Sequence, residues 1–215
     1  MSHIIIFGSS NDYGYGDHEG GWVQRLRKLM DKKTLLDGEY YYLLYNLAVS
    51  GDTSDNLLER FEDETRRRVY DIEDPDKTIV ILCIGKNDIC WSKEKNDFSV
   101  PIEKFGGNVR DLISLSKKYS NHPVIIGPGV VDDSLCNPWK TFDYYLKNEN
   151  LERYNNKLQQ ICLEEKINFI EIFSVFKEKD YKKLLMDGLH LNNQGHELLF
   201  KIVKNYLEKN KIVEL

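Results

Sequence analysis

The stretch His3-Ile4-Ile5-Ile6-Phe7-Gly8-Ser9-Ser10 is an apolar run that ends in a small, polar turn. A short run rich in β-branched residues is typical of a strand that is buried on both faces, as the strands of a parallel sheet are. Four further runs share this character, and together they predict five strands: His3–Phe7, Tyr40–Leu47, Thr78–Ile84, Val124–Gly127 and Ile167–Ile172.

Amphipathic stretches lie between these runs, with apolar residues at helical spacing. They span Trp22–Met30, Leu57–Phe61, Leu112–Leu115, Leu151–Cys162 and Leu198–Leu207. Short polar side chains before two of them are expected to cap the helices, namely Asp52 or Thr53 and Asn192. The alternation of strands and helices predicts an α/β fold, with a parallel sheet covered by helices on both faces.

The composition is that of an ordinary globular protein, with 215 residues of which 41% are apolar and 30% charged. This length suits one domain, 1–215, with a sizeable core. A net charge of −5 and the absence of an extended basic patch argue against a nucleic-acid partner. No run approaches the ~20 apolar residues that cross a bilayer, so we expect no membrane insertion.

The four cysteines have no Cys-x-x-Cys spacing and are Cys83, Cys90, Cys136 and Cys162. We therefore expect reduced thiols, a cytoplasmic location and no structural zinc site.

Polar residues follow the predicted strands: Ser10 the first, Gly51 the second and Asn87 the third. Ligands of parallel sheets gather at the carboxyl ends of the strands. Two longer irregular stretches, 11–21 and 130–150, either border a pocket there or simply cover the surface. The second contains the aromatic residues Trp139, Phe142, Tyr144 and Tyr145.

Ser10 needs a base to act as a nucleophile, because a free serine hydroxyl is weak at neutral pH. His190 is the candidate base, and Asp187, three residues earlier, can orient the imidazole. Donors for an oxyanion would be the N–H groups of Ser10 and Gly51 and the amide of Asn87. Each feature alone has a simpler alternative: a turn at Asp187, a surface or capping role for His190, and turns at Gly51 and Asn87.

Four blocks occur in a fixed order along the chain: Gly8-x-Ser10, Gly51, Gly85-x-Asn87-Asp88 and Asp187-x-x-His190. In these blocks the chain closely resembles the SGNH hydrolase superfamily, also called GDSL-type esterases and lipases. The resemblance runs from Ile4 to Asn192 and includes the segments 46–53 and 20–23.

The resemblance implies a flavodoxin-like three-layer α/β/α sandwich with a central five-stranded sheet, and a chemistry that needs no metal or organic cofactor. It implies that Ser10 is the nucleophile, that Asp187 and His190 complete the triad, and that Ser10, Gly51 and Asn87 form the oxyanion hole.

The first block departs from the family, because the usual Gly-Asp-Ser-Ile-Thr reads Gly8-Ser9-Ser10-Asn11-Asp12. Ser9 replaces the aspartate before the nucleophile, which removes a supporting carboxylate, and Asp12 is the candidate substitute. Gly14 falls where the family has a later glycine, which favours Ser10 over Ser9 as the nucleophile.

Further residues are candidates for the substrate pocket. Asp12, Trp139 and Tyr144 are the main ones, and His18 is a weaker one with a surface position as its alternative. Asp132 and Asp133, after Gly127-Pro128-Gly129, either contact substrate or form a solvated turn. The remaining histidines are expected to be structural or solvated: His3, His122 and His196.

The leading hypothesis is a serine esterase that hydrolyses small or short-acyl carboxylic esters through an acyl-enzyme on Ser10. An alternative within the same superfamily is a carbohydrate O-deacetylase, with Trp139, Tyr144 and Tyr145 stacking on a sugar ring. An alternative of another class is a non-catalytic, ligand- or nucleotide-binding α/β domain. Gly8-Ser9-Ser10 is a poor phosphate loop, however, because it lacks the Gly-x-x-x-x-Gly-Lys-Ser/Thr pattern.

Overall fold

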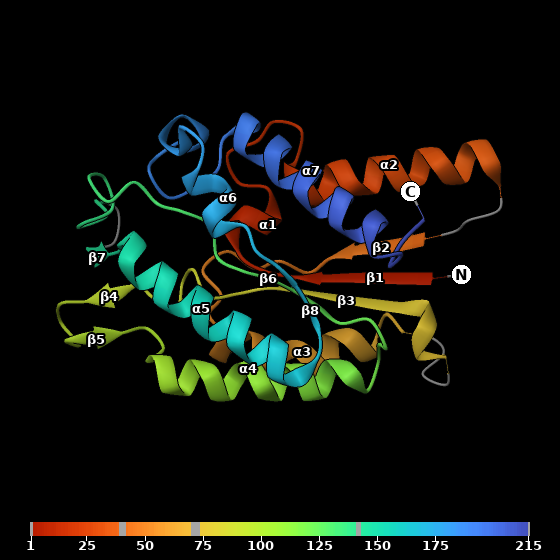
Figure 1. Cartoon of the computed structure of the whole chain (residues 1–215), viewed down its shortest axis with the longest axis horizontal. Coiled ribbons are helices and arrows are strands. Elements are labelled where there is room, and N and C mark those ends of the chain that lie inside the picture. The colour runs from red at the N-terminus through yellow and green to blue at the C-terminus, as the bar shows by residue number, and fades with distance from the viewer. Residues whose placement is uncertain (1, 39–41, 70–73, 141–142, 215) are drawn as a thin grey trace.

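The central element is a five-stranded parallel sheet with the strand order β2-β1-β3-β6-β8. The computed structural model describes residues 2–38, 42–69, 74–140 and 143–214. The strands of this sheet are β1 (Ser2–Phe7), β2 (Tyr42–Asn46), β3 (Thr78–Cys83), β6 (Val124–Ile126) and β8 (Asn168–Ile170). The five predicted strands and their parallel arrangement are thus confirmed (Figure 1).

The central position of β1 explains its apolar sequence. It pairs with β2 on one side and β3 on the other, and its residues Ile4–Phe7 are fully buried. β2 lies at an edge of the sheet and is only partly buried, unlike the fully buried strand that its apolar run predicts. The predicted start of β2 at Tyr40 lies outside the described residues.

The remaining strands, β3, β6 and β8, are shorter than predicted. β3 ends at Cys83 because Gly85, with φ of +107°, turns the chain away from the sheet. β8 covers three residues because its only sheet neighbour in the described chain, β6, is itself three residues long.

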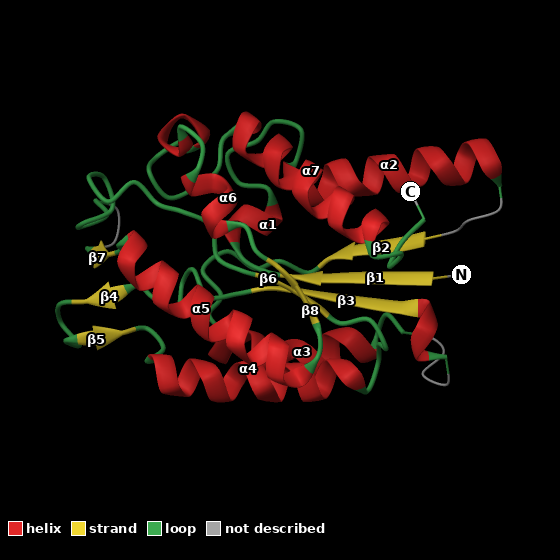
Figure 2. Ribbon diagram, in the orientation of Figure 1, coloured by secondary structure: helices red, strands yellow, loops and turns green. Residues whose placement is uncertain are grey.

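Helices cover both faces of the sheet and confirm the three-layer architecture (Figures 1 and 2). One layer contains α2 (Gly21–Asp37) and α7 (Asn193–Lys209), and the other α3 (Ser54–Arg66), α4 (Ile102–Lys117) and α5 (Asn148–Glu165). Thr53 caps α3 by accepting from Asn56 N–H, and Asn192 caps α7 by accepting from the N–H groups of Gln194 and Gly195. Of the two predicted caps for α3, Thr53 rather than Asp52 is therefore correct.

Both stretches predicted as irregular contain regular structure. The first includes α1 (Ser10–Tyr13), directly after β1. The second contributes β7 (Tyr144–Tyr145) to a small antiparallel sheet with β4 (Trp91–Ser92) and β5 (Asp97–Phe98), beyond the carboxyl ends of the central strands (Figure 1). Strands of two residues carry no periodicity, so the sequence gives no sign of them. The short helices α6 (Phe173–Lys177), Pro75–Lys77 and Tyr181–Leu184 complete the described chain.

None of the helices in the described part of the chain combines the length and apolarity that a bilayer span requires.

Candidate active site

Ser10 occupies the first position of α1, where the chain turns sharply after β1. Gly8 permits this turn, because a Cβ atom there would lie 2.3 Å from Oδ2 of Asp12. The same Asp12 Oδ2 accepts from Ser9 N–H at 2.9 Å, while Oδ1 accepts from the indole N–H of Trp22 at 3.0 Å. Asp12 thus supplies a carboxylate that braces the turn, as expected for the substitute of the family aspartate.

Asp12 does not line the cleft in which Ser10 lies. Its side chain is buried and, with Ser9, lines an adjoining cavity of about 40 Å³. Burial raises the pKa of the Asp12 carboxyl, and the hydrogen bonds from Ser9 and Trp22 only partly oppose this rise. The structure therefore gives Asp12 a supporting position rather than the predicted place in the substrate pocket.

His190 links the serine to the aspartate. Its Nε2 lies 3.0 Å from Ser10 Oγ, and its Nδ1 lies 2.7 Å from Asp187 Oδ2. With the proton on Nδ1, the imidazole donates to Asp187 and can accept the hydroxyl proton of Ser10. The structure thus brings together the three residues of the predicted triad, and Ser10 rather than Ser9 is the serine that contacts the imidazole.

The turn from Asp187 to His190 is fixed by its own backbone. Asp187 Oδ1 accepts from the N–H groups of Leu189 at 3.0 Å and His190 at 2.8 Å, and Gly188 has φ of +89°. Burial acts to raise the pKa of Asp187, but the bonds from the His190 side chain and from these N–H groups outweigh it and lower the pKa to about 2. Asp187 is therefore a carboxylate throughout the neutral pH range.

The predicted oxyanion donors lie in the same cleft. Gly51 has φ of +89°, and both Gly51 and Asn87 line the cleft beside Ser10. Asn87 Nδ2 donates to the carbonyl of Asp52 at 2.8 Å, which fixes the amide plane and leaves its second hydrogen for another acceptor. Asp52 is in turn held by Arg60 of α3 at 2.7 Å.

Asp88, next to Asn87, ties this block to the start of α3. Its Oδ1 accepts from Ser54 N–H at 2.9 Å. Burial raises the pKa of Asp88 to about 6, although hydrogen bonds from Ser54 oppose the rise.

Aromatic side chains form the walls of the cleft, which has a volume of about 590 Å³. The ring of Tyr15 lies 4.6 Å and that of Trp139 5.8 Å from the imidazole of His190, centroid to centroid. Tyr144 lines the cleft with them, so Trp139 and Tyr144 lie where they were predicted. Tyr15 was missed, because nothing in a glycine-rich stretch marks one tyrosine as facing a histidine 175 residues later.

The other two aromatic residues of this stretch are Tyr145 and Phe142, and Tyr145 does not line the cleft. Tyr145 points elsewhere and makes an edge-to-face contact with Trp91, with 5.4 Å between the ring centroids, so it cannot act with Tyr144 on one ligand ring in the cleft. Adjacent strand residues face opposite sides of a sheet, which explains this difference between Tyr144 and Tyr145. Phe142 lies outside the described residues.

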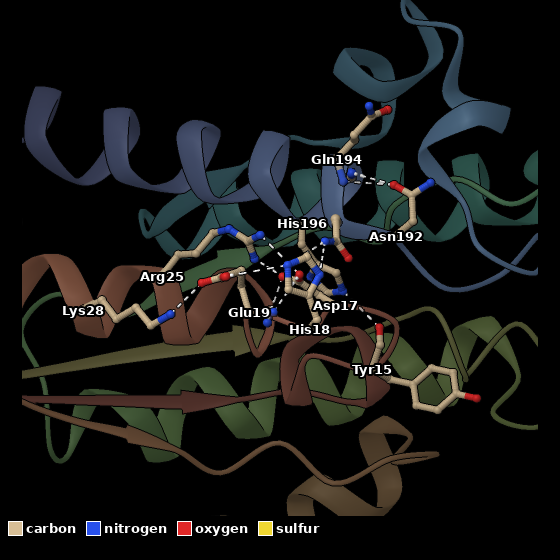
Figure 3. A network of polar contacts seen from close by, with 12 residues as sticks. Tyr15, Asp17, His18, Glu19, Arg25, Lys28, Asn192, Gln194 and His196 are labelled. Atoms are coloured by element: carbon tan, nitrogen blue, oxygen red, sulfur yellow. Dashed lines mark hydrogen bonds and ion pairs between the residues drawn. The ribbon is translucent and has the colours of Figure 1, made fainter.

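A polar network holds the loop that carries Tyr15 (Figure 3). Asp17 accepts from Gly21 N–H at the start of α2 and forms an ion pair with Arg25 of the same helix. His196 of α7 is fully buried, and its Nε2 lies 3.0 Å from the carbonyl oxygen of Tyr15. Burial lowers the pKa of His196 to about 4, so it is a neutral donor here. Figure 3 shows the phenol ring of Tyr15 pointing away from this network.

His18 belongs to the outer side of this loop. Its side chain is 72% exposed and contacts Asn193, so the structure does not place it in the pocket. Among the histidines expected to be structural or solvated, His3 and His196 are buried and His122 is partly exposed.

Asp132 and Asp133 form hydrogen bonds and an ion pair with other residues of the chain, and neither lines the cleft. Asp133 Oδ1 accepts from Asn148 N–H at the first turn of α5 at 2.8 Å. Asp132 accepts from Ser134 and pairs with Lys182 at 2.9 Å.

The four cysteines are free thiols. Cys90 lines the cleft, and burial raises the pKa of its thiol to about 12, which makes it a poor nucleophile at neutral pH. Within the described ranges, no group of three or more His, Cys, Asp or Glu residues is arranged to hold a metal ion.

The site connects a hydroxyl, an imidazole and a carboxylate by hydrogen bonds at the carboxyl ends of a parallel sheet. This arrangement is typical of serine hydrolases. Residues 5–198 match the model of the GDSL-like Lipase/Acylhydrolase family, and the chain belongs to this family. The resemblance seen in the sequence is thereby confirmed.

Curated relatives carry the names of esterases. The chain is 33% identical over 136 residues to an isoamyl acetate-hydrolyzing esterase of Saccharomyces cerevisiae. The matched region covers 58% of this chain and 56% of the relative. The chain is 23% identical over 141 residues to an isoamyl acetate-hydrolyzing esterase 1 homolog of Homo sapiens, covering 60% and 55%. The matched region thus spans little more than half the length of these two relatives.

Solved structures share the fold across nearly the whole chain. A lipase/acylhydrolase from Enterococcus faecalis has a TM-score of 0.71 and 21% identity, with 98% of this chain and 97% of that chain covered. An acetylxylan esterase from Geobacillus stearothermophilus has a TM-score of 0.71 and 18% identity, with 96% and 94% covered. Catalytic mutants of the latter replace a serine, a histidine or an aspartate by alanine.

Proposed function

We propose that this chain hydrolyses carboxylic esters of short acyl groups through an acyl-enzyme on Ser10. The observation that carries the proposal is the series Ser10 Oγ to His190 Nε2 at 3.0 Å and His190 Nδ1 to Asp187 Oδ2 at 2.7 Å, at the wall of a cleft of about 590 Å³. Both distances are those of hydrogen bonds between a nucleophile, its base and the group that orients the base.

In the acylation step, Ser10 Oγ attacks the ester carbonyl carbon while His190 Nε2 takes the hydroxyl proton. The tetrahedral intermediate collapses by breaking the bond to the alcohol oxygen, which receives the proton from His190. Water then repeats the sequence on the acyl-enzyme, with His190 again as base, and releases the acid and free Ser10. Asp187 stabilises the imidazolium that forms twice in this cycle.

The negative oxygen of the intermediate needs donors that are already in place. We assign this role to the N–H groups of Ser10 and Gly51 and to the side-chain amide of Asn87. The fixed amide of Asn87 and the positive φ of Gly51 support the assignment, because a preorganised donor needs no reorganisation when the charge develops.

Acetate esters of small alcohols are the substrates that we favour. The curated relative from Saccharomyces cerevisiae is named for the hydrolysis of isoamyl acetate, and the cleft walls near His190 offer aromatic surface from Tyr15 and Trp139 to an apolar alcohol. We expect hydrolysis to be fastest for acetyl and to fall through butyryl to octanoyl esters.

The test is a panel of p-nitrophenyl esters with acetyl, butyryl and octanoyl groups. Ser10→Ala is expected to abolish hydrolysis and labelling by a fluorophosphonate probe, while the far-UV circular dichroism stays the same. Ser9→Ala is the matched control and should retain both activities, because its neighbour and not Ser9 contacts His190. Wild-type hydrolysis by Ser10→Ala would refute the proposal, and failure of the folded wild-type protein to be labelled would favour a non-catalytic binding domain.

A second candidate function is the deacetylation of carbohydrates. Trp139 and Tyr144 line the cleft close to His190, where they could stack on a sugar ring. Acetate release from acetylated xylose or cellobiose, measured beside release from isoamyl acetate at equal concentration, separates the two candidates. A kcat/KM at least tenfold higher for the sugar esters would establish the second.

A further inference from the structure

Lys86 occupies the variable position of the Gly85-x-Asn87 block, directly before the amide assigned to the oxyanion. Its Nζ donates to two backbone carbonyls, that of Leu189 at 2.6 Å and that of Val130 at 3.0 Å. One ammonium group therefore joins three loops that lie far apart in the sequence: the loop after β3, the loop after β6 and the turn that carries His190.

The bond to Leu189 reaches the triad through a single peptide unit. The carbonyl of Leu189 accepts from Lys86, and the N–H at the other end of the same peptide unit, that of His190, donates to Asp187 Oδ1 at 2.8 Å. A cation at the oxygen of a peptide group polarises it and strengthens the bond that its N–H donates. The series Lys86, peptide, Asp187 is thus a continuous polar connection from the oxyanion block to the carboxylate.

We propose that Lys86 is a positioning residue for the hydrolysis: its ammonium holds the Asp187–His190 turn at a fixed place relative to Asn87. The inference rests on the proposed esterase function. Lys86 touches no reacting atom in this scheme, and it acts through the backbone of Leu189 and His190.

A side chain without an N–H donor, such as methionine, would leave the carbonyls of Leu189 and Val130 without this partner, and the turn would lose its connection to the oxyanion block. A deprotonated Lys86 would keep two N–H groups for these carbonyls but would lose the charge that polarises the peptide group. The turn keeps two other long-range bonds, from Asp132 N–H to the carbonyl of Gly188 at 2.7 Å and from Leu191 N–H to Asn11 Oδ1 at 2.9 Å. We therefore expect removal of Lys86 to loosen the His190 end of the turn without releasing it.

The charge of Lys86 titrates close to neutral pH. Burial lowers the pKa of Lys86 to about 8, and Asp187 and Asp12 oppose this change only in part. The other titratable groups that interact with it are Cys90, Cys136 and His196. Burial raises the pKa of Cys136 to about 11 and that of Cys90 to about 12, and lowers that of His196 to about 4, so none of the three titrates near pH 8.

The experiment measures kcat and KM for p-nitrophenyl acetate from pH 6 to 10, corrected for spontaneous hydrolysis. The wild-type protein is expected to lose kcat above about pH 8, as Lys86 gives up its proton. Lys86→Met should lower kcat by about 10- to 100-fold, keep KM within about twofold and abolish this alkaline loss. Lys86→Arg, which keeps the charge, should recover part of kcat and move the loss to higher pH. Lys183→Met is the control for charge alone, since Lys183 is 80% exposed and pairs with Asp180.

A second measurement does not depend on ester hydrolysis. The hydrogen on His190 Nδ1 should give a low-field proton resonance, identified by its loss in Asp187→Asn, and Lys86→Met should broaden or shift it while Lys183→Met does not. An unchanged resonance together with wild-type kcat in Lys86→Met overturns the inference. If the wild-type protein cleaves no ester, the proposed function fails, and the resonance alone decides whether Lys86 positions the turn.

Discussion

Replacing Asp187 by asparagine tests the electrostatics of the triad with almost no change in side-chain size. The asparagine oxygen can still accept from the N–H groups of Leu189 and His190, which holds the turn. Its amide nitrogen, however, would face His190 Nδ1, where the structure has a carboxylate oxygen at 2.7 Å. Two donors cannot share this contact, so the imidazole would move its proton to Nε2 and could no longer accept from Ser10.

The expected loss of kcat follows from this change of tautomer. The corresponding change in another serine hydrolase lowers kcat by about 10⁴-fold, which equals about 5 kcal/mol of transition-state stabilisation. We expect a loss of this order in Asp187→Asn, with KM for p-nitrophenyl acetate changed less than about threefold because the cleft walls are untouched.

The effect on stability depends on pH in a defined direction. Hydrogen bonds lower the pKa of Asp187 from 3.8 to about 2, and this difference corresponds to about 2.4 kcal/mol of stability. Because 30% of the side chain is exposed, solvent screening reduces this to roughly 1–2 kcal/mol. Since the pKa in the folded state is the lower one, this stabilisation is present above about pH 4 and is lost as the pH falls through 2.

The assay is urea unfolding of the wild-type protein and Asp187→Asn at pH 7, 4, 3 and 2, beside kcat at pH 7. The difference in unfolding free energy should shrink from pH 4 towards pH 2, because Asp187 takes up a proton in this range and asparagine does not titrate. Asp180→Asn is the control, since Asp180 is 66% exposed and lies outside the cleft. A variant with more than a tenth of wild-type kcat, or a difference that stays constant down to pH 2, would refute the reasoning.

Three further substitutions test the surroundings of the triad. Asn87→Ala should lower kcat by about 10²- to 10³-fold with little change in KM, measured in the same ester assay. Asp12→Ala should lower the unfolding free energy by roughly 2–5 kcal/mol in urea titrations, because it leaves the buried N–H groups of Ser9 and Trp22 without their acceptor; a loss under 1 kcal/mol would contradict this role. Trp139→Ala should raise KM by about tenfold for apolar esters while Ser10 still reacts with a fluorophosphonate probe.

The parts of the fold that follow from local pattern were predictable. The apolar runs of β1 and β3 and the helical spacing of α2, α5 and α7 are set by burial on the sheet, so the sequence carries them directly. The four blocks that contain the proposed triad and oxyanion donors were recognisable through the resemblance to the SGNH hydrolases, and each follows a strand or precedes α7.

The parts that depend on contacts between distant segments were not predictable. The small sheet of β4, β5 and β7 pairs residues that are up to 54 positions apart, in strands of two residues, which leaves no local signal. Asp12 looked like a residue facing substrate, yet Trp22 and Ser9 draw its carboxylate inward. The contact of Lys86 with Leu189 spans 103 positions and involves a backbone carbonyl, an acceptor that every residue offers.

The contact between Ser10 and His190 also determines when the proposed active site is complete as the chain folds. The two residues are 180 positions apart, whereas Asn87 and Asp52 are 35 apart. For a flexible chain, closing the longer loop costs about 1.5 kcal/mol more in entropy than closing the shorter one. Synthesis up to Asn87 provides the proposed nucleophile and oxyanion donors but not the proposed base. Helical content should therefore return before ester hydrolysis during refolding, so the proposed hydrolysis would report the last stage of assembly.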